Sequence, residues 1–171
     1  MDRNDRFDVF TYERYYAHGV CIVKEGDNTV YMSESNDEYV KQVYPPDPDM
    51  VATQTTYFAD TLTVSGEGCF LKGWNVEIGV WRSYDQNGDL IREVNKDEHY
   101  PIPWIEMITH FRVNDINVRQ IRLLRRTLDQ DSGRYLWALT LKAPYGTLDM
   151  ALFDAATGEL VSRKQTQIIV S

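Results

Sequence analysis

The chain has 171 residues, 43% of them hydrophobic and 26% charged, a composition typical of a folded globular protein rather than a disordered chain. Its longest apolar runs are far shorter than the roughly 20 residues that cross a bilayer, which excludes a membrane-spanning helix. The net charge of −8 arises mainly in residues 1–60, where five Lys or Arg face twelve Asp or Glu. This field disfavours nucleic acid and anionic membranes as partners and favours a basic protein, although solubility alone also explains an acidic surface.

The length predicts one domain over residues 1–171, with subregions at 1–50, 51–100 and 101–171. The N-terminus lacks the basic start and apolar run of a secretory signal, so the sequence predicts a cytoplasmic protein. A periplasmic location stays open, because a chain that has lost its signal peptide looks the same. Cys21 and Cys69 lie in apolar contexts that favour reduced core thiols, with a single disulfide between them as the alternative.

The first subregion predicts a β-hairpin and a further strand. Residues 19–24 and 29–33 are β-rich, and the four residues 25–28 between them form a hairpin turn. The strand at 39–44 must end before the three prolines of residues 45–49, because proline removes a ladder donor and restricts the residue before it. We expect residues 45–49 to form an extended surface loop.

The second subregion predicts an antiparallel meander. Residues 61–64 and 69–71 are predicted strands on either side of a turn at 65–68. The best-defined hairpin runs from about Val76 to Val94. Its turn contains Asn87-Gly88, the strongest short-range hairpin signal, because both residue types tolerate positive φ.

The third subregion predicts a helix packed on a sheet. Pro103 is well placed as the first residue of a helix over 104–111, whose apolar residues recur at helical spacing. Four strands follow, at 121–128, 135–142, 147–153 and 160–166. Residues 118–126 also fit an amphipathic helix, so the first of these strands has a helical alternative. The predicted fold class is α+β, an antiparallel β-meander with one main helix packed on the C-terminal sheet.

The search for catalytic chemistry finds little. His18, His99 and His110 have no neighbouring nucleophile that completes a known pattern, although a hydrolase site assembled in space from His99 or His110 and a carboxylate stays open. Phosphate-binding glycine motifs are absent. The acidic turn at 85–89 departs from a calcium loop, because Gly88 falls at position 4 instead of position 6. We predict no catalytic residue, no metal site, no cofactor and no enzymatic activity.

Arginines form one basic cluster, comprising Arg119, Arg122, Arg125 and Arg126. The cluster invites a nucleic-acid interpretation, but strand alternation would divide it between two faces of a sheet. We therefore favour solvent-facing arginines that pair with the acidic N-terminal section.

Two segments carry resemblances to known families. Residues 79–93, GVWRSYDQNGDLIRE, resemble the G-x-W-x-x-Y-x-x-N-G-x-L-x-x-E unit of MORN-like, YwqK-type antitoxin repeats, which occur in many bacterial polymorphic-toxin immunity proteins. Residues 57–73 resemble a degenerate second copy. The C-terminal half, with its D-x-x-T-G-E turn at 154–159, is similar to PepSY-type or inhibitor-like units.

Together these resemblances imply an immunity protein encoded beside a contact-dependent or type VI secreted toxin, which it binds and blocks. The implied partner is a basic toxin, for example a nuclease, and neither nucleic acid nor a membrane is expected as a partner. The predicted contact surface comprises Glu34, Asp37 and Glu38 in one acidic loop and Asp47 and Asp49 in another. The alternative is a PepSY-like domain of the cell envelope that binds a small ligand or peptide. The sequence does not determine the oligomeric state.

Overall fold

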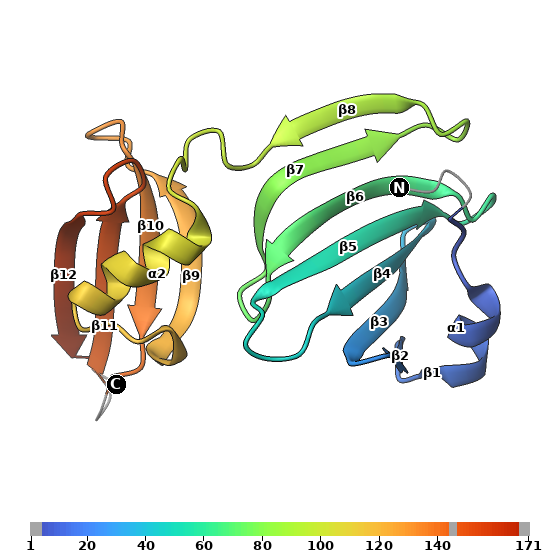
Figure 1. Ribbon diagram of the computed structural model, residues 1–171, viewed down its shortest axis with the longest axis horizontal. Helices are drawn as coiled ribbons and strands as arrows, with labels where there is room; N and C mark the ends of the chain where they lie inside the picture. The colour runs from blue at the N-terminus through green and yellow to red at the C-terminus, as the bar shows by residue number, and fades with distance from the viewer. Residues whose placement is uncertain (1–4, 144–146, 168–171) are drawn as a thin grey trace. The chain divides into compact units, whose positions relative to one another are not determined.

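The computed structural model describes residues 5–143 and 147–167, and the chain divides into two compact units, Met1–Lys96 and Asp97–Ser171 (Figure 1). The boundary between the units lies close to the start of the third predicted subregion, at residue 101. The expectation of a single domain stays a prediction, which cooperative unfolding can test.

The first unit is an antiparallel meander in which each strand pairs with its neighbours along the chain. A short helix, α1 (Val9–Tyr15), precedes the eight strands. The strands are β1 (Tyr16–Ala17), β2 (Val20–Glu25), β3 (Asn28–Ser35), β4 (Glu38–Tyr44), β5 (Val51–Phe58), β6 (Val64–Leu71), β7 (Val76–Tyr84) and β8 (Leu90–Asn95). The β-meander that the sequence predicts is therefore confirmed.

The hairpin of β7 and β8 forms as predicted, with a five-residue turn that the side chain of Asp85 organises. Asp85 Oδ1 accepts hydrogen bonds from the backbone N–H groups of Asn87 and Asp89, both at 2.9 Å. Of Asn87 and Gly88, only Gly88 has positive φ, at 84°. The turn therefore depends on a glycine and on side-chain capping, not on two successive left-handed residues.

The turn predicted at residues 65–68 is wrong. These residues lie inside β6, and the chain turns at 59–63 instead, after β5, a strand that the sequence pattern does not predict. Gly68 belongs in a strand here because the ring of Trp81 occupies the place of a side chain: a Cβ at Gly68 would lie 2.2 Å from Trp81 Cδ2. Glycine inside a strand often marks such a close approach.

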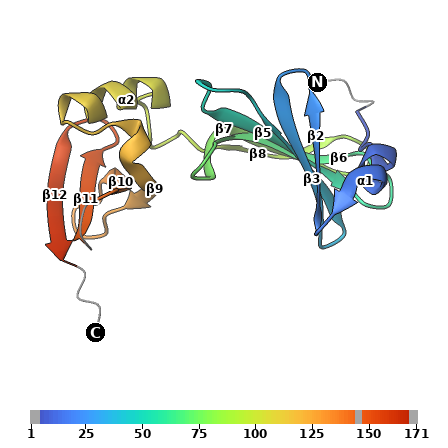
Figure 2. The same cartoon turned by 90° about the horizontal axis from the view of Figure 1, so that it is seen from below.

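One face of the first sheet carries an aromatic core that α1 covers (Figure 2). Phe7 stacks on Tyr39 with 4.4 Å between the ring centroids, and Tyr57 packs beside them. Asp8 caps α1 by accepting a hydrogen bond from the N–H of Thr11 at 3.0 Å. Hydrogen bonding by the Thr11 side chain, and then by its backbone N–H, lowers the pKa of the Asp8 carboxyl. The core also contains the free thiol of Cys21, and Cys69 is a free thiol as well.

The second unit packs one helix on a four-stranded antiparallel sheet of order β12-β11-β10-β9. Its elements are α2 (Trp104–Val113), the 3-10 turn η1 (Val118–Gln120), β9 (Ile121–Leu128), β10 (Tyr135–Leu141), β11 (Thr147–Asp154) and β12 (Leu160–Gln167). All four predicted strands form, and the helical alternative is limited to η1. Residues 144–146, between the second and third of these predicted strands, lie outside the described residues.

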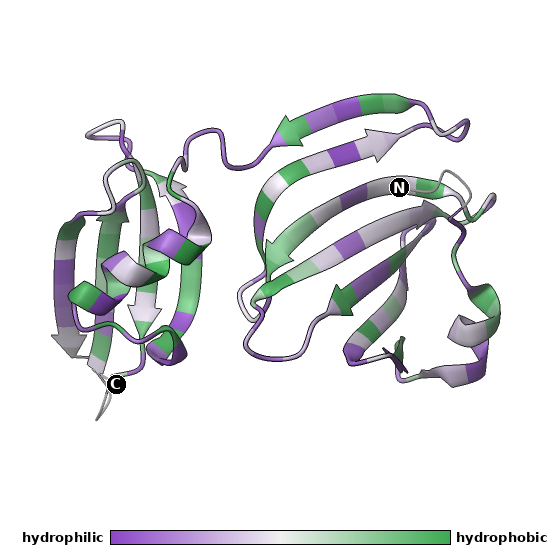
Figure 3. Cartoon of the chain, viewed as in Figure 1, coloured by the Kyte–Doolittle hydropathy of each residue, from purple (hydrophilic) through white to green (hydrophobic). Residues whose placement is uncertain are grey.

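The core of the second unit is aromatic. Trp104 and Phe111 of α2 are buried, with Trp137 and Phe153 of the sheet beside them. Figure 3 shows hydrophobic residues along β10 and β11 and a largely hydrophilic β12, which protects an edge strand from pairing with other chains. No helix in the described part of the chain is long and apolar enough to cross a membrane.

The expectation that all four arginines of the basic cluster face solvent is wrong for Arg126. Its guanidinium carbon lies 4.4 Å from the ring centroid of Tyr100 and 4.6 Å from that of Trp137, and Arg126 Nη2 pairs with Asp97 at 2.6 Å. This partner belongs to the second unit, not to the acidic N-terminal section. Arg126 is therefore a structural residue of the C-terminal unit.

Candidate functional site

A pocket of about 630 Å³ lies on the sheet of the first unit. Its lining residues come from β4, β5, β6, β7 and β8 and from the turn that joins β7 to β8. The pocket is within the size range of small-ligand and side-chain binding sites in proteins, which is about 300–1,000 Å³.

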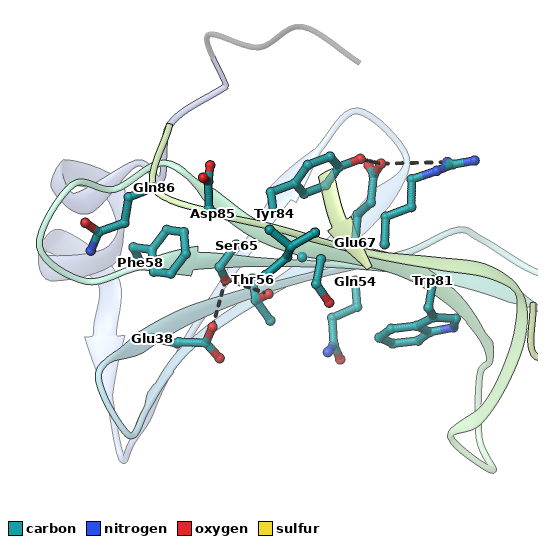
Figure 4. A pocket seen from close by; sticks show the side chains of 14 residues that line it. Glu38, Gln54, Thr56, Phe58, Ser65, Glu67, Trp81, Tyr84, Asp85 and Gln86 are labelled. Atoms are coloured by element: carbon teal, nitrogen blue, oxygen red, sulfur yellow. Dashed lines mark hydrogen bonds and ion pairs between the residues drawn. The ribbon is translucent and has the colours of Figure 1, made fainter. Parts of the chain in front are cut away.

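Strand pairing shows which side chains face the pocket. Thr56 pairs with Gly66, which pairs with Ser83, and directly paired residues share a face of a sheet. The next row, with Glu67 and Arg82, faces the opposite side, where α1 and the aromatic core lie. Figure 4 shows Glu38, Gln54 and Trp81 on one side of the ribbon and the side chains of Glu67 and Tyr84 on the other.

The indole of Trp81 forms an aromatic wall of the pocket. It lies against the backbone of Gly68, and its Nε1 donates a hydrogen bond to the carbonyl oxygen of Cys69 at 3.1 Å. Phe58 contributes a second ring to the lining. The glycine and the hydrogen bond together fix the orientation of the Trp81 ring.

Glu38 is the carboxylate on the pocket side of the sheet. Its Oε1 accepts a hydrogen bond from Ser65 Oγ at 2.8 Å, and the same hydroxyl lies 2.9 Å from Thr56 Oγ1. Ser65 is only 7% exposed, and its buried hydroxyl orients the Glu38 carboxylate through this hydrogen bond. Within residues 5–143 and 147–167, Glu38 has no ion-pair partner.

The opposite face carries a polar network of four residues. Tyr84 Oη donates to Glu67 Oε1 at 2.5 Å, and Arg82 Nε donates to Glu93 Oε2 at 2.9 Å. Arg82 Nη1 also lies 3.8 Å from Glu67 Oε1. Burial, and then the hydrogen bond to the Glu67 carboxylate, raise the pKa of Tyr84 to about 12. Arg82 therefore directs its charge away from the pocket.

This network predicts a loss of stability at alkaline pH. Because the pKa of Tyr84 is about 10 in the unfolded chain and about 12 in the folded one, its contribution is fully present below pH 10 and is lost as the pH rises toward 12. We expect the urea midpoint of the wild type to fall over this range, and that of Tyr84→Phe to fall less. Equal falls in the two proteins would show that Tyr84 does not contribute.

Three alternate turns of the meander bring acidic residues to one edge of the sheet, the edge at which β3, β5 and β7 end. The turns that follow β3, β5 and β7 lie at the same edge, because alternate turns of an antiparallel meander do so. We define the acidic edge as Glu34, Asp37, Glu38, Asp60, Asp85 and Asp89. Residues 34–38, 59–63 and 85–89 include no Lys or Arg. Hydrogen bonds from the N–H groups of Asp89 and Asn87 lower the pKa of Asp85, which keeps it charged.

Arg6 is a basic residue near this edge, because it forms an isolated bridge with Thr63. The opposite edge differs in its charge balance. There Lys41 pairs with Glu25 at 2.9 Å, and Lys72 pairs with Asp47 at 2.8 Å. Glu25 and Asp47 at that edge therefore have basic partners, whereas the acidic edge is largely uncompensated.

The structure separates the five predicted contact residues into two groups. Glu34, Asp37 and Glu38 belong to the acidic edge, whereas Asp47 and Asp49 lie beyond the other end of β4. A seven-residue strand is about 20 Å long, so one small contact surface does not include both groups.

Sequence reasoning missed three members of the acidic edge: Asp60, Asp85 and Asp89. The signal that could have found them is the order of turns along a meander. Without β5 the turns are assigned wrongly, because leaving out one strand of a meander places every later turn at the opposite edge of the sheet.

The described residues contain no group of three or more His, Cys, Asp or Glu side chains arranged to hold a metal ion. No family model matches the chain, and no curated protein sequence matches it either.

Proposed function

We propose that this protein is a non-enzymatic immunity protein that binds a cognate secreted toxin and blocks its action. The acidic edge is the observation that carries the proposal. A toxin that acts on nucleic acid needs a basic surface for phosphate groups, and a row of carboxylates on rigid turns can occupy such a surface. The resemblance of residues 79–93 to antitoxin repeats supports the same function. We place the protein in the cytoplasm, where such a toxin acts.

Solubility alone explains the acidic edge less well than a binding role. A solubilising surface needs net charge, but it does not need that charge gathered in three turns at one edge. At the opposite edge, Lys96 also pairs with Glu77, as Lys41 and Lys72 do with their own carboxylates. Uncompensated charge at one edge steers a basic partner to that edge and speeds its association.

A second candidate function is the binding of a small ligand or peptide in the cell envelope. The pocket beside the acidic edge favours it, because a pocket of this size can hold a ligand without any toxin. The two candidates differ in the partner that they require. Rescue of cell growth from a toxin supports only the first.

Charge neutralisation at each edge tests the proposed function. We compare the triple variant Glu34→Gln, Asp37→Asn, Asp89→Asn with a control, Asp27→Asn, Asp47→Asn, Asp49→Asn. Each removes three negative charges and changes the net charge from −8 to −5. Because exposed charge pairs contribute up to about 1 kcal/mol each, we expect the first variant to weaken toxin binding by about tenfold or more. The control should change binding by less than about twofold, since its charges lie at the other edge.

Binding to the product of the adjacent gene is measured by calorimetry at low and moderate salt, with growth rescue in co-expressing cells as the biological readout. If that product forms no complex and growth is not rescued, the immunity function is wrong. Equal weakening by the two triple variants would show that only the overall charge matters and that the acidic edge is not the contact surface.

A further inference from the structure

We propose that the pocket beside the acidic edge binds the guanidinium group of an arginine side chain. Glu38 supplies the carboxylate, its partner Phe58 on β5 supplies the nearer ring, and Trp81 forms an aromatic wall farther along the strands. That a toxin supplies this arginine rests on the proposed function, whereas the chemistry of the pocket does not.

The charges around the pocket favour a cation. Glu38 faces the pocket with a single hydrogen bond, from Ser65, and the described residues offer it no cation. Asp85 is also a lining residue, but its carboxylate accepts hydrogen bonds from the N–H groups of its own turn, so Glu38 is the carboxylate left for a ligand. Arg82 is the basic residue of the lining, and its guanidinium is paired with Glu93 on the other face. A half-buried carboxylate without a cationic partner gains from a charged hydrogen-bond donor.

The aromatic walls favour a planar cation with an apolar stem. A guanidinium stacks on an aromatic face more readily than an ammonium does, and it donates several hydrogen bonds in its own plane. Trp81 already attracts a positive charge, since Lys96 Nζ lies 5.8 Å from its ring centroid and also pairs with Glu77. The hydroxyls of Thr56 and Ser83, which lie in one row across the sheet, offer further acceptors in the lining.

The second unit contains an intramolecular site of the same chemistry. There Arg126 lies over the rings of Tyr100 and Trp137, and its guanidinium pairs with the carboxylate of Asp97. The pocket of the first unit also has a carboxylate, Glu38, and two aromatic rings in its lining. Lys96 near Trp81 pairs with Glu77, so a cation for Glu38 must come from outside. Its volume of about 630 Å³ exceeds what a guanidinium needs, so the stem and adjoining backbone of the arginine fit as well.

The test uses N-acetyl-arginine methylamide as the probe, titrated into the full chain and followed by NMR at the Trp81 indole. The matched probes are the corresponding citrulline derivative, which has the same shape without the charge, and the lysine derivative. We expect the arginine probe to bind at least about tenfold more tightly than the citrulline probe, and also more tightly than the lysine probe. Glu38→Gln should weaken arginine binding by about tenfold, because the neutral amide keeps its oxygen for Ser65 but loses the ion pair. Asp49→Asn, beyond the far end of β4, should leave it unchanged.

The outcomes separate the pocket from the proposed function. Equal binding of the arginine and citrulline probes, or no effect of Glu38→Gln in a variant with an unchanged circular dichroism spectrum, would overturn the assignment. Lysine binding as tight as arginine binding would overturn the guanidinium preference. Arginine binding without a toxin complex would leave the pocket standing and remove the immunity function. A toxin complex without arginine binding would support the immunity function and overturn the assignment of the pocket.

Discussion

Gly68→Ala is expected to lower the free energy of unfolding by about 2 kcal/mol and to disturb the pocket, because a Cβ there would lie 2.2 Å from Trp81 Cδ2. The atoms on both sides are constrained. The indole is held by its hydrogen bond to the carbonyl oxygen of Cys69, and Gly68 lies inside β6. Relief of the clash therefore requires Trp81 to leave its place, which also removes the aromatic wall. Urea unfolding followed by circular dichroism measures the loss.

A double-mutant cycle distinguishes this clash from a general intolerance of alanine in β6. If the clash is the cause, Gly68→Ala combined with Trp81→Leu should be about as stable as Trp81→Leu alone. Arginine binding should be reduced in both single variants, since each removes or displaces the ring. Additive destabilisation in the double variant would show that Gly68 is required for some reason other than the indole.

Trp137→Ala should produce the largest loss of stability, about 3–5 kcal/mol in the second unit. Trp137 is completely buried and packs against Tyr100 and Trp104, with ring centroids 5.3 and 5.7 Å away. The guanidinium of Arg126 also lies over the Trp137 ring. The substitution therefore leaves a cavity and removes one of the two rings that contact this cation. The matched control is Ile105→Ala, at a residue 71% exposed on α2, which should cost less than about 0.5 kcal/mol.

The same variant tests whether the chain behaves as one domain. Trp74 and Trp81 belong to the first unit and Trp104 to the second, so their indole NMR signals report on each unit separately. If the chain is one cooperative domain, as its length predicts, Trp137→Ala should lower the urea midpoint of all three signals equally. A shift confined to Trp104 would show two independently folding domains and overturn that prediction.

The sequence predicts a helix, strand or hairpin correctly where the residues of that element alone indicate it. The helix over Trp104 to Val113 has apolar residues at helical spacing, and the hairpin at β7 and β8 has an Asn-Gly turn. The strands of the second unit are bounded by clear turn residues. Each of these signals lies within a dozen residues, so no knowledge of the rest of the fold was needed.

Prediction failed where a residue's role depends on a distant neighbour. Gly66 and Gly68 suggest a turn, but Thr56 and Trp81 of the adjoining strands fill the space above them. β5 lacks a clear alternating pattern, because its apolar residues Val51, Ala52, Tyr57 and Phe58 lie at its two ends and Thr and Gln fill its centre. α1 has only seven residues and forms against the aromatic core, not through its own periodicity. The acidic edge was only partly predicted for the same reason, because its membership follows from the strand order.

The neighbour-to-neighbour strand order of the first unit has a consequence for how such a protein can change. Because every strand of this sheet pairs with strands adjacent in the chain, a turn can be lengthened, shortened or replaced without altering the register of any ladder. The three turns at the acidic edge can therefore vary independently while the scaffold persists. A new binding preference would require the exchange of three short connections, and descendants of one ancestral chain could diverge in what they recognise while sharing every strand.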